Sequence, residues 1–342
     1  MKSKLYLLLA LSLFAASFAF AAEAPTYQLT NRFSVSGEGG WDYLTYDVDA
    51  SRLFITRGTH VMAVDPVSGK TLADIPDTQG VHGLALAPDL GLAATSNGRA
   101  NSVSIFDLKT LQKTAEVKAG TNPDAILYDA FSHLVFAFNA RSRDVTVIDP
   151  VKAAVVATIP LDGQPEFAAT DERGHVFVNI EDKNGLARID VQTRKVTALW
   201  PLTGCDGPSG LAIDRKLGRL FSVCGNQVMT VLNSATGELV ATVPIGKRPD
   251  AAAFDPETRL AFSSNGEGTL TVVHQDSPDK YTVLQTLPTA VGARTLALDP
   301  RSHTIYLVTA KFGPAPPPTP EQPRPRPAML PGSFEVLVVS AK

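Results

Sequence analysis

The sequence predicts an all-β fold, a seven-bladed β-propeller built from four-stranded antiparallel blades. An aligned position, occupied by proline in four of the seven repeats and followed six residues later by aspartate or alanine, recurs seven times at intervals of 40 to 44 residues. Within each interval, short apolar runs alternate with turn-forming Asp, Asn, Pro and Gly. The last repeat is incomplete, and the beginning of the chain can complete it. A period of this length with four strands is typical of propellers.

The repeat is clearest between Thr121 and Gly163. Its four apolar runs are Ala125–Tyr128, Leu134–Phe138, Val145–Ile148 and Val155–Ile159. Runs of this length, bounded by turn formers, are typical of strands rather than helices. We therefore expect each repeat to fold into four consecutive strands, named a to d from the axis outwards.

The seven repeats align on the residue that precedes strand a and on a position at the end of that strand. The aligned pairs are Trp41 with Asp47, Val81 with Ala87, Pro123 with Asp129, Pro165 with Asp171, Pro208 with Asp214, Pro249 with Asp255, and Ala293 with Asp299. A β-sandwich or a barrel would not repeat so evenly.

The seventh repeat lacks a strand of its own. It supplies Thr295–Leu298, Thr304–Thr309 and Phe334–Val339, and then the chain stops. The segment Tyr27–Val35, ahead of the first repeat, is expected to supply strand d. Pairing of the two ends would close the propeller and leave no open sheet edge between them.

The first 22 residues are predicted to be a signal peptide. Lys2 and Lys4 precede the apolar run Leu5–Phe20, and Ala19-Phe20-Ala21 offers a small-x-small cleavage site. A retained membrane anchor is the alternative, although the run is short for a span of about 20 residues. Residues 23–342 are expected to form a single propeller domain in the periplasm or outside the cell, with no membrane span after cleavage.

A proline-rich loop, residues 313–332, interrupts the last blade. It contains nine prolines, which lack the donor that a sheet ladder needs. We expect an extended, polyproline-like conformation between strands b and c. Three roles stay open, namely a stiff spacer, an arm that docks a partner, and a flap over the neighbouring face.

Charge and cysteine content narrow the functional classes. Removing Lys2 and Lys4 changes the net charge from −3 to −5, and the basic residues form no cluster, so nucleic-acid binding is not expected.

The two cysteines, Cys205 and Cys224, fall at the entry of strand a and the exit of strand b in the fifth repeat. Adjacent antiparallel strands bring these points together, so a disulfide is predicted. We expect a monomer.

The residue after each aligned position forms the main candidate site. These seven residues are Asp42, His82, Asp124, Glu166, Ser209, Asp250 and Arg294. All of them lie at the mouth of a strand a and should converge near the axis, where they could bind a divalent cation or a small polar ligand. The alternative is structural, because a repeated aspartate can bond the backbone of the next blade.

Two further binding hypotheses concern the face of the propeller on which the innermost strands begin. Arg294 and Lys311 are both expected to flank it, which predicts an anionic ligand or partner segment beside the proline-rich loop. His60 and His82, with Asp42, could hold a transition metal, although no tight ligand motif supports this. No nucleophile motif such as G-x-S-x-G is present, so covalent catalysis is not expected.

The repeat resembles the YVTN-repeat β-propellers, the YncE-like family of exported bacterial proteins. The matching residues are Asn139, Asp144–Asp149 and Val156–Pro160, whereas Phe136-Ala-Phe-Asn139 replaces the tetrapeptide that names the family. The resemblance implies a seven-bladed propeller outside the cytoplasm and a non-catalytic role in binding a small polar ligand, an ion or a partner protein. The alternative is a metal-assisted, lactonase-like hydrolase that uses Asp42, Glu166, Asp250 and the asparagines of strand b.

Overall fold

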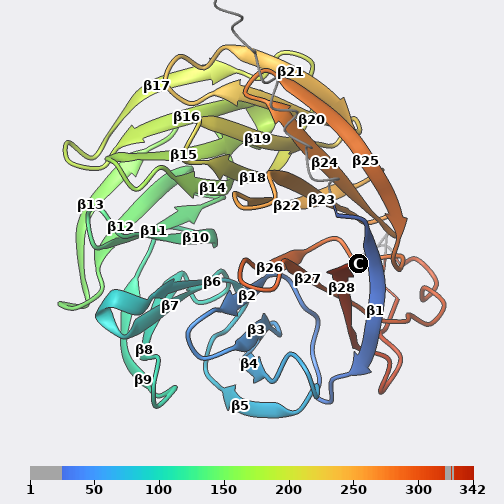
Figure 1. Ribbon diagram of the computed structural model, residues 1–342. Coiled ribbons are helices and arrows are strands. Elements are labelled where there is room, and N and C mark those ends of the chain that lie inside the picture. The colour runs from blue at the N-terminus through green and yellow to red at the C-terminus, as the bar shows by residue number, and fades with distance from the viewer. Residues whose placement is uncertain (1–24, 320–324, 326) are drawn as a thin grey trace, which may run out of the picture.

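The computed structural model describes residues 25–319, 325 and 327–342. These residues form seven four-stranded antiparallel sheets arranged as blades around an axis (Figure 1). The predicted seven-bladed, all-β propeller is therefore confirmed. The helical elements of the described ranges are two short 3₁₀ helices, η1 (Pro88–Leu90) and η2 (Glu181–Lys183). The predicted signal peptide lies outside the described residues.

Each of the first six blades uses four consecutive strands of the chain, and the innermost strand of each surrounds the axis. From blade 1 to blade 6 the strands are β2 (Leu44–Asp47), β3 (Arg52–Thr56), β4 (Val61–Val64), β5 (Thr71–Ile75); β6 (Val81–Ala87), β7 (Leu92–Asn97), β8 (Ser102–Asp107), β9 (Lys113–Lys118); β10 (Pro123–Asp129), β11 (Leu134–Asn139), β12 (Asp144–Asp149), β13 (Ala154–Pro160); β14 (Pro165–Thr170), β15 (His175–Ile180), β16 (Gly185–Asp190), β17 (Lys195–Pro201); β18 (Pro208–Asp214), β19 (Arg219–Cys224), β20 (Val228–Asn233), β21 (Leu239–Pro244); and β22 (Pro249–Asp255), β23 (Leu260–Asn265), β24 (Thr269–Ser277), β25 (Lys280–Pro288).

Blade 7 joins the two ends of the described chain. Strands β26 (Leu296–Asp299), β27 (Thr304–Thr309) and β28 (Glu335–Ala341) are completed by β1 (Tyr27–Ser34), which pairs antiparallel with β28 from Tyr27↔Ala341 to Ser34↔Glu335. The side-chain amide of Gln285 in blade 6 clamps β1 further. It accepts from the Tyr27 N–H at 2.9 Å and donates to the Tyr27 carbonyl at 2.8 Å. The predicted closure is confirmed.

The hydrophobic core is divided among the blade interfaces. Seven clusters of buried side chains occur in the described residues, and each draws on two adjacent blades. Phe54 of blade 1 and Phe106 of blade 2 meet in one of them, with ring centroids 6.5 Å apart. Apolar burial therefore stabilises the contacts between blades and depends on every blade having both neighbours.

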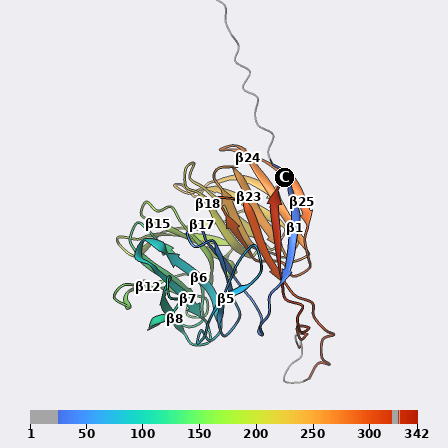
Figure 2. The ribbon, with the colours of Figure 1, turned by 60° about the horizontal axis from the view of Figure 1, so that its bottom comes forward.

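The connections separate onto two faces. The connections from strand d to strand a and from b to c lie on one face, which we call the entry face, and the a-to-b and c-to-d turns lie on the other. Figure 2 shows the described part of the proline-rich loop projecting from one side of the blades, with the C-terminus on the opposite side. The described part of the chain contains no helix long and apolar enough to cross a membrane.

The predicted disulfide is present. Cys205 and Cys224 are joined with a Cα–Cα distance of 5.4 Å. Both sulfurs are buried against Leu202 and Leu211 between blades 4 and 5. The bond ties the connection that enters β18 to the end of β19, on the entry face.

Candidate functional site

Each candidate side chain is placed by the start of an innermost strand. Five are the second residue of their strand, whereas Asp42 and Arg294 each lie two residues before theirs, β2 and β26. We call these seven residues the polar ring: Asp42, His82, Asp124, Glu166, Ser209, Asp250 and Arg294. Because the innermost strands start near the axis on the entry face, the polar ring lies around the axis on that face.

The backbone of the polar ring links the blades. Its carbonyls mostly accept a hydrogen bond from the preceding blade, as when the Thr295 hydroxyl donates to Asp42 at 2.6 Å and the Asn179 amide to Ser209 at 2.8 Å. The Ser96 and Ser264 hydroxyls donate in the same way to Asp124 and Arg294. Backbone carbonyls therefore make the contacts that the structural alternative assigned to aspartate side chains.

One half of the polar ring is centred on His82. Its Nδ1 lies 2.6 Å from Asp42 Oδ2 and 3.5 Å from Asp124 Oδ1, so the imidazole lies between carboxylates of the two adjacent blades. One ligand atom from each of the three residues lies within 4.8 Å of the others. A cation could occupy this position in place of the imidazole proton, because imidazole and carboxylate are both common metal ligands.

The other half is centred on Arg294. Its Nη1 lies 2.7 Å from Asp250 Oδ2 and its Nη2 lies 3.5 Å from Asp42 Oδ1. The Ser209 hydroxyl lies 3.0 Å from Asp250 Oδ1. Arg294 is therefore engaged by two carboxylates, which does not support the anionic ligand expected there. Lys311 lies outside the polar ring, exposed beside the proline-rich loop, where its N–H bonds the Ser333 hydroxyl at 3.0 Å.

The acids of the polar ring are short of positive charge. Burial, together with the charges of Asp124 and Glu181, raises the pKa of Glu166 to about 9. Burial raises the pKa of Asp250 to about 6, although Arg294 opposes the shift. It also raises the pKa of Asp124, partly offset by His82. Glu166 therefore holds at neutral pH a proton that a bound cation would displace.

The pKa values of the two basic groups are also raised, although burial alone would lower them. Burial alone would lower the pKa of His82, but the hydrogen bond to Asp42 and the charge of Asp124 outweigh it, so the pKa is raised. In the same way, Asp250 and Asp42 outweigh burial and raise the pKa of Arg294. Both side chains are therefore stabilised as cations by the same carboxylates that define the site.

Two expected metal ligands lie elsewhere. His60 Nε2 is 3.9 Å from Asp74 on the outermost strand of blade 1, and the ligand atoms that meet at His82 come from Asp42 and Asp124 and not from His60. The asparagines of strand b serve the sheet instead of the axis. Asn139 and Asn265 donate to strand-c hydroxyls, Thr146 at 2.9 Å and Thr271 at 3.0 Å. A hydrolase that needs these asparagines as metal ligands loses that part of its donor set.

Sequence reasoning missed Tyr43 and the fully buried Arg57. Tyr43 follows Asp42 and packs edge-on against Phe167 of blade 4, with ring centroids 4.6 Å apart. Burial, then the charges of Asp124 and Asp42, raise the pKa of Tyr43 well above its usual value. The sequence feature that could have identified Tyr43 is its position directly after Asp42 of the polar ring.

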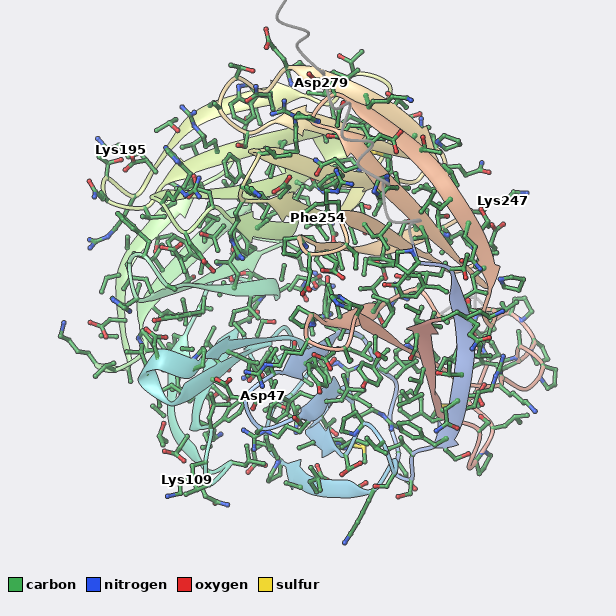
Figure 3. All side chains as sticks on the ribbon, in the orientation of Figure 1. Asp47, Lys109, Lys195, Lys247, Phe254 and Asp279 are labelled. Carbon is green, nitrogen blue, oxygen red and sulfur yellow. A yellow bond between two sulfur atoms is a disulfide. The ribbon has the colours of Figure 1, made fainter. Side chains whose placement is uncertain are left out.

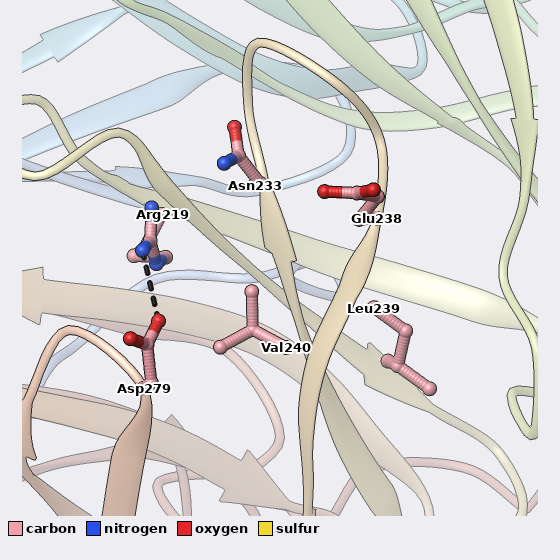
Figure 4. Close-up of a pocket in the computed structure, with 6 residues that line it drawn as sticks. All are labelled: Arg219, Asn233, Glu238, Leu239, Val240 and Asp279. Carbon is pink, nitrogen blue, oxygen red and sulfur yellow. Dashed lines mark hydrogen bonds and ion pairs between the residues drawn. The ribbon is translucent and has the colours of Figure 1, made fainter.

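Other hollows lie away from the axis. The groove in Figure 4, about 520 Å³, lies at the outer rim, where Arg219 pairs with Asp279 at 3.0 Å. Figure 3 shows Lys109, Lys195 and Lys247 at the periphery, whereas Phe254 lies near the axis. The charged side chains of this rim groove come from blades 5 and 6 alone, unlike the polar ring, which draws on all seven blades.

Comparisons with solved structures give the same fold. The chain is similar to a structure titled hydrazine synthase of Kuenenia stuttgartiensis, with a TM-score of 0.71 and 17% identity over 80% of this chain and 93% of that chain. It is also similar to U3-55K, with a TM-score of 0.74 and 11% identity over 90% and 98% of the two chains. A chain of the mitotic checkpoint complex gives a TM-score of 0.73 and 14% identity over 96% and 98%. No protein-family model and no curated protein matches the sequence.

Proposed function

We propose that this protein is an exported, non-catalytic binding propeller of the YVTN-repeat type, whose polar ring binds a small cationic ligand. The observation that carries the proposal is the meeting of Asp42, His82 and Asp124 on the entry face, with ligand atoms within 4.8 Å of one another. Asp250 and Glu166 add two more acids, against which the polar ring offers only two basic side chains. A bound cation would offset this excess of buried negative charge.

Several observations support the coarser parts of the proposal. The disulfide is compatible with an oxidising compartment, and the sequence begins with a segment of signal-peptide character. The repeat residues quoted above support the YVTN-type assignment. The polar ring carries no serine or cysteine beside a free base, because the Ser209 hydroxyl donates to Asp250. A binding role therefore accounts for the site more simply than covalent chemistry does.

The test is equilibrium dialysis and calorimetry of the purified protein against Ca²⁺, Mn²⁺, Zn²⁺ and methylammonium. We expect saturable, one-to-one binding of at least one of these cations. Asp124→Asn should weaken that binding at least tenfold, whereas Asp162→Asn, an exposed acid on the same face, should not. The proposal fails if none of the four cations binds, or if both variants bind as the unchanged protein does.

If the protein binds a metal, a second candidate function has to be tested, that of a metal-assisted hydrolase. The three donors around His82 favour it, since a metal held there could polarise a carbonyl or a bound water. The distinguishing assay is metal-dependent hydrolysis of lactones and esters. Binding of a metal without turnover supports the binding propeller, and turnover that Asp124→Asn abolishes supports the hydrolase.

A further inference from the structure

A cavity lies beside the polar ring, one step further along the innermost strands. It has a volume of about 200 Å³ and is lined by residues of blades 1 to 4, including Tyr43, Leu84, Ala125, Ile126, Phe167 and Ala168. We call it the inner cavity. Most of its side chains are aromatic or aliphatic, and the Thr45 hydroxyl donates to the Leu84 carbonyl at 2.8 Å. Polar atoms also contribute to its surface, so it can take a short apolar group beside polar contacts.

The inner cavity and the acidic half of the polar ring are adjacent in the chain. Tyr43, Gly83, Ala125 and Phe167 line the cavity, and each directly follows a polar-ring residue in its own blade. The polar residues in question are Asp42, His82, Asp124 and Glu166. A molecule bound at the polar ring can therefore place one end among carboxylates and the other in the inner cavity.

Tyr43 connects the two environments. Its ring packs on Phe167, and the charges of four polar-ring acids act on its hydroxyl. Within the described residues the Tyr43 hydroxyl has no hydrogen-bond partner, although it is close to this polar surface. An aromatic face beside an anionic cluster favours an organic cation, because ring quadrupole and carboxylates both attract positive charge.

We propose that the ligand of the polar ring is a protonated amine that carries a short alkyl or aryl group, with its ammonium among Asp42, Asp124 and Glu166 and its apolar group in the inner cavity. The proposal rests on the cation-binding function above and names its ligand class. A bare metal ion would leave the inner cavity unused. A carboxylate would be repelled by the acids, and a neutral alcohol would leave them uncompensated.

The experiment is calorimetric titration with methyl-, propyl-, butyl-, hexyl- and phenethylammonium, with 1-hexanol and hexanoate as chemically matched controls. Affinity should rise about fourfold for each methylene that enters the inner cavity, and level off once it is full. Hexanol and hexanoate should bind at least tenfold more weakly than hexylammonium.

Two variants separate the inner cavity from the charge. Ala168→Leu should remove the dependence on chain length while methylammonium binding is kept, because Ala168 lines the inner cavity. The matched control is Ala252→Leu, the same change at the equivalent position of blade 6, where the side chain lines a second cavity and not this one. Ala252→Leu should keep the full chain-length series.

The possible failures are distinguishable. Methylammonium binding without any gain from longer chains overturns the amphipathic ligand and leaves the cation site standing. Metal binding without amine binding has the same consequence. Absence of binding by every cation overturns both proposals. Equal effects of the Ala168 and Ala252 substitutions would also overturn the assignment of the apolar group to the inner cavity.

Discussion

At the scale of single residues, Glu166 is the most perturbed acid of the polar ring. Its folded-state pKa of about 9 lies far above the ordinary value of 4.5, chiefly because it is buried. Since the folded state holds the proton more tightly than the unfolded chain does, Glu166 disfavours folding increasingly as pH rises from about 4.5 towards 9. Glu166 therefore lowers the stability of the ligand-free protein. A role in ligand binding would explain why the protein keeps a residue with this cost.

Glu166→Gln should therefore stabilise the ligand-free protein at alkaline pH. Glutamine keeps the size and hydrogen-bonding capacity of the neutral acid but cannot ionise. We expect the melting temperature to rise by about 2 °C or more at pH 8.5, with little change at pH 4.5, where both proteins carry a neutral side chain. Scanning calorimetry at the two pH values measures this, and a gain of the same size at both would contradict the assignment.

Arg294 should contribute to stability as an ion-pair partner in the polar ring. Arg294→Met leaves Asp250 and Asp42 without their guanidinium, so we expect a loss of about 1–2 kcal/mol at pH 8, a modest value because the arginine is half-exposed. At pH 5, below the pKa of about 6 of Asp250, the loss should be smaller. Urea unfolding measures both, with Lys109→Met at the periphery as control. An unchanged unfolding free energy at pH 8 would show that the pairs contribute nothing.

At the scale of elements, the connection from β1 to β2 is organised by Arg57. This guanidinium is fully buried at the end of β3. It donates to the carbonyls of Gly37, Gly39 and Gly40 at 3.0 to 3.2 Å, and it lies 3.9 Å from the Phe334 ring centroid. Gly39 adopts φ +91°, and a Cβ there would come within 2.6 Å of the Arg57 carbonyl. The glycines are therefore needed to wrap the arginine.

Arg57→Ala should destabilise the connection from β1 to β2. It removes the donors of several buried carbonyls, so we expect a loss of about 3 kcal/mol or more in unfolding free energy. The loss should appear together with faster amide exchange in residues 36–43 and at the start of β28. Arg141→Ala, an exposed arginine, is the control. Exchange that stays unchanged in residues 36–43 would mean that the connection is held by other contacts.

The elements were more predictable than the contacts of the site. The 40–44-residue period fixed the strands because each blade repeats the same alternation of apolar runs and turn formers. Membership of the polar ring followed from one position per repeat. The partners of His82 did not, because they depend on the distance between neighbouring strand mouths. Arg57 was not predicted to be buried, since its cage comes from a glycine-rich segment that is irregular in sequence.

At the scale of the whole molecule, closure through β1 governs stability. The last blade takes its outermost strand from the start of the described chain, and Gln285 of blade 6 holds that strand. Removing residues 1–34 exposes β28 and uncovers Leu337 and Val339 at the interface of blades 6 and 7.

This truncation should cost the entire propeller instead of one blade. Because each cluster of the core needs both of its blades, we expect loss of the cooperative melting transition and aggregation on gel filtration. A variant that lacks only residues 1–24, and so keeps β1, is the matched control and should melt as the full chain does. A monomeric truncated protein with a sharp transition would contradict closure as the source of stability.

The central claim is that the polar ring binds a cation in place of protons. Its most direct test is calorimetric titration of methylammonium, which stays charged between pH 5.5 and 8.5, into the protein across that range. We predict that affinity rises about tenfold or more with pH, as Asp250 ionises and as binding draws a proton from Glu166. Affinity that is independent of pH, or the absence of binding at every pH, would contradict the claim.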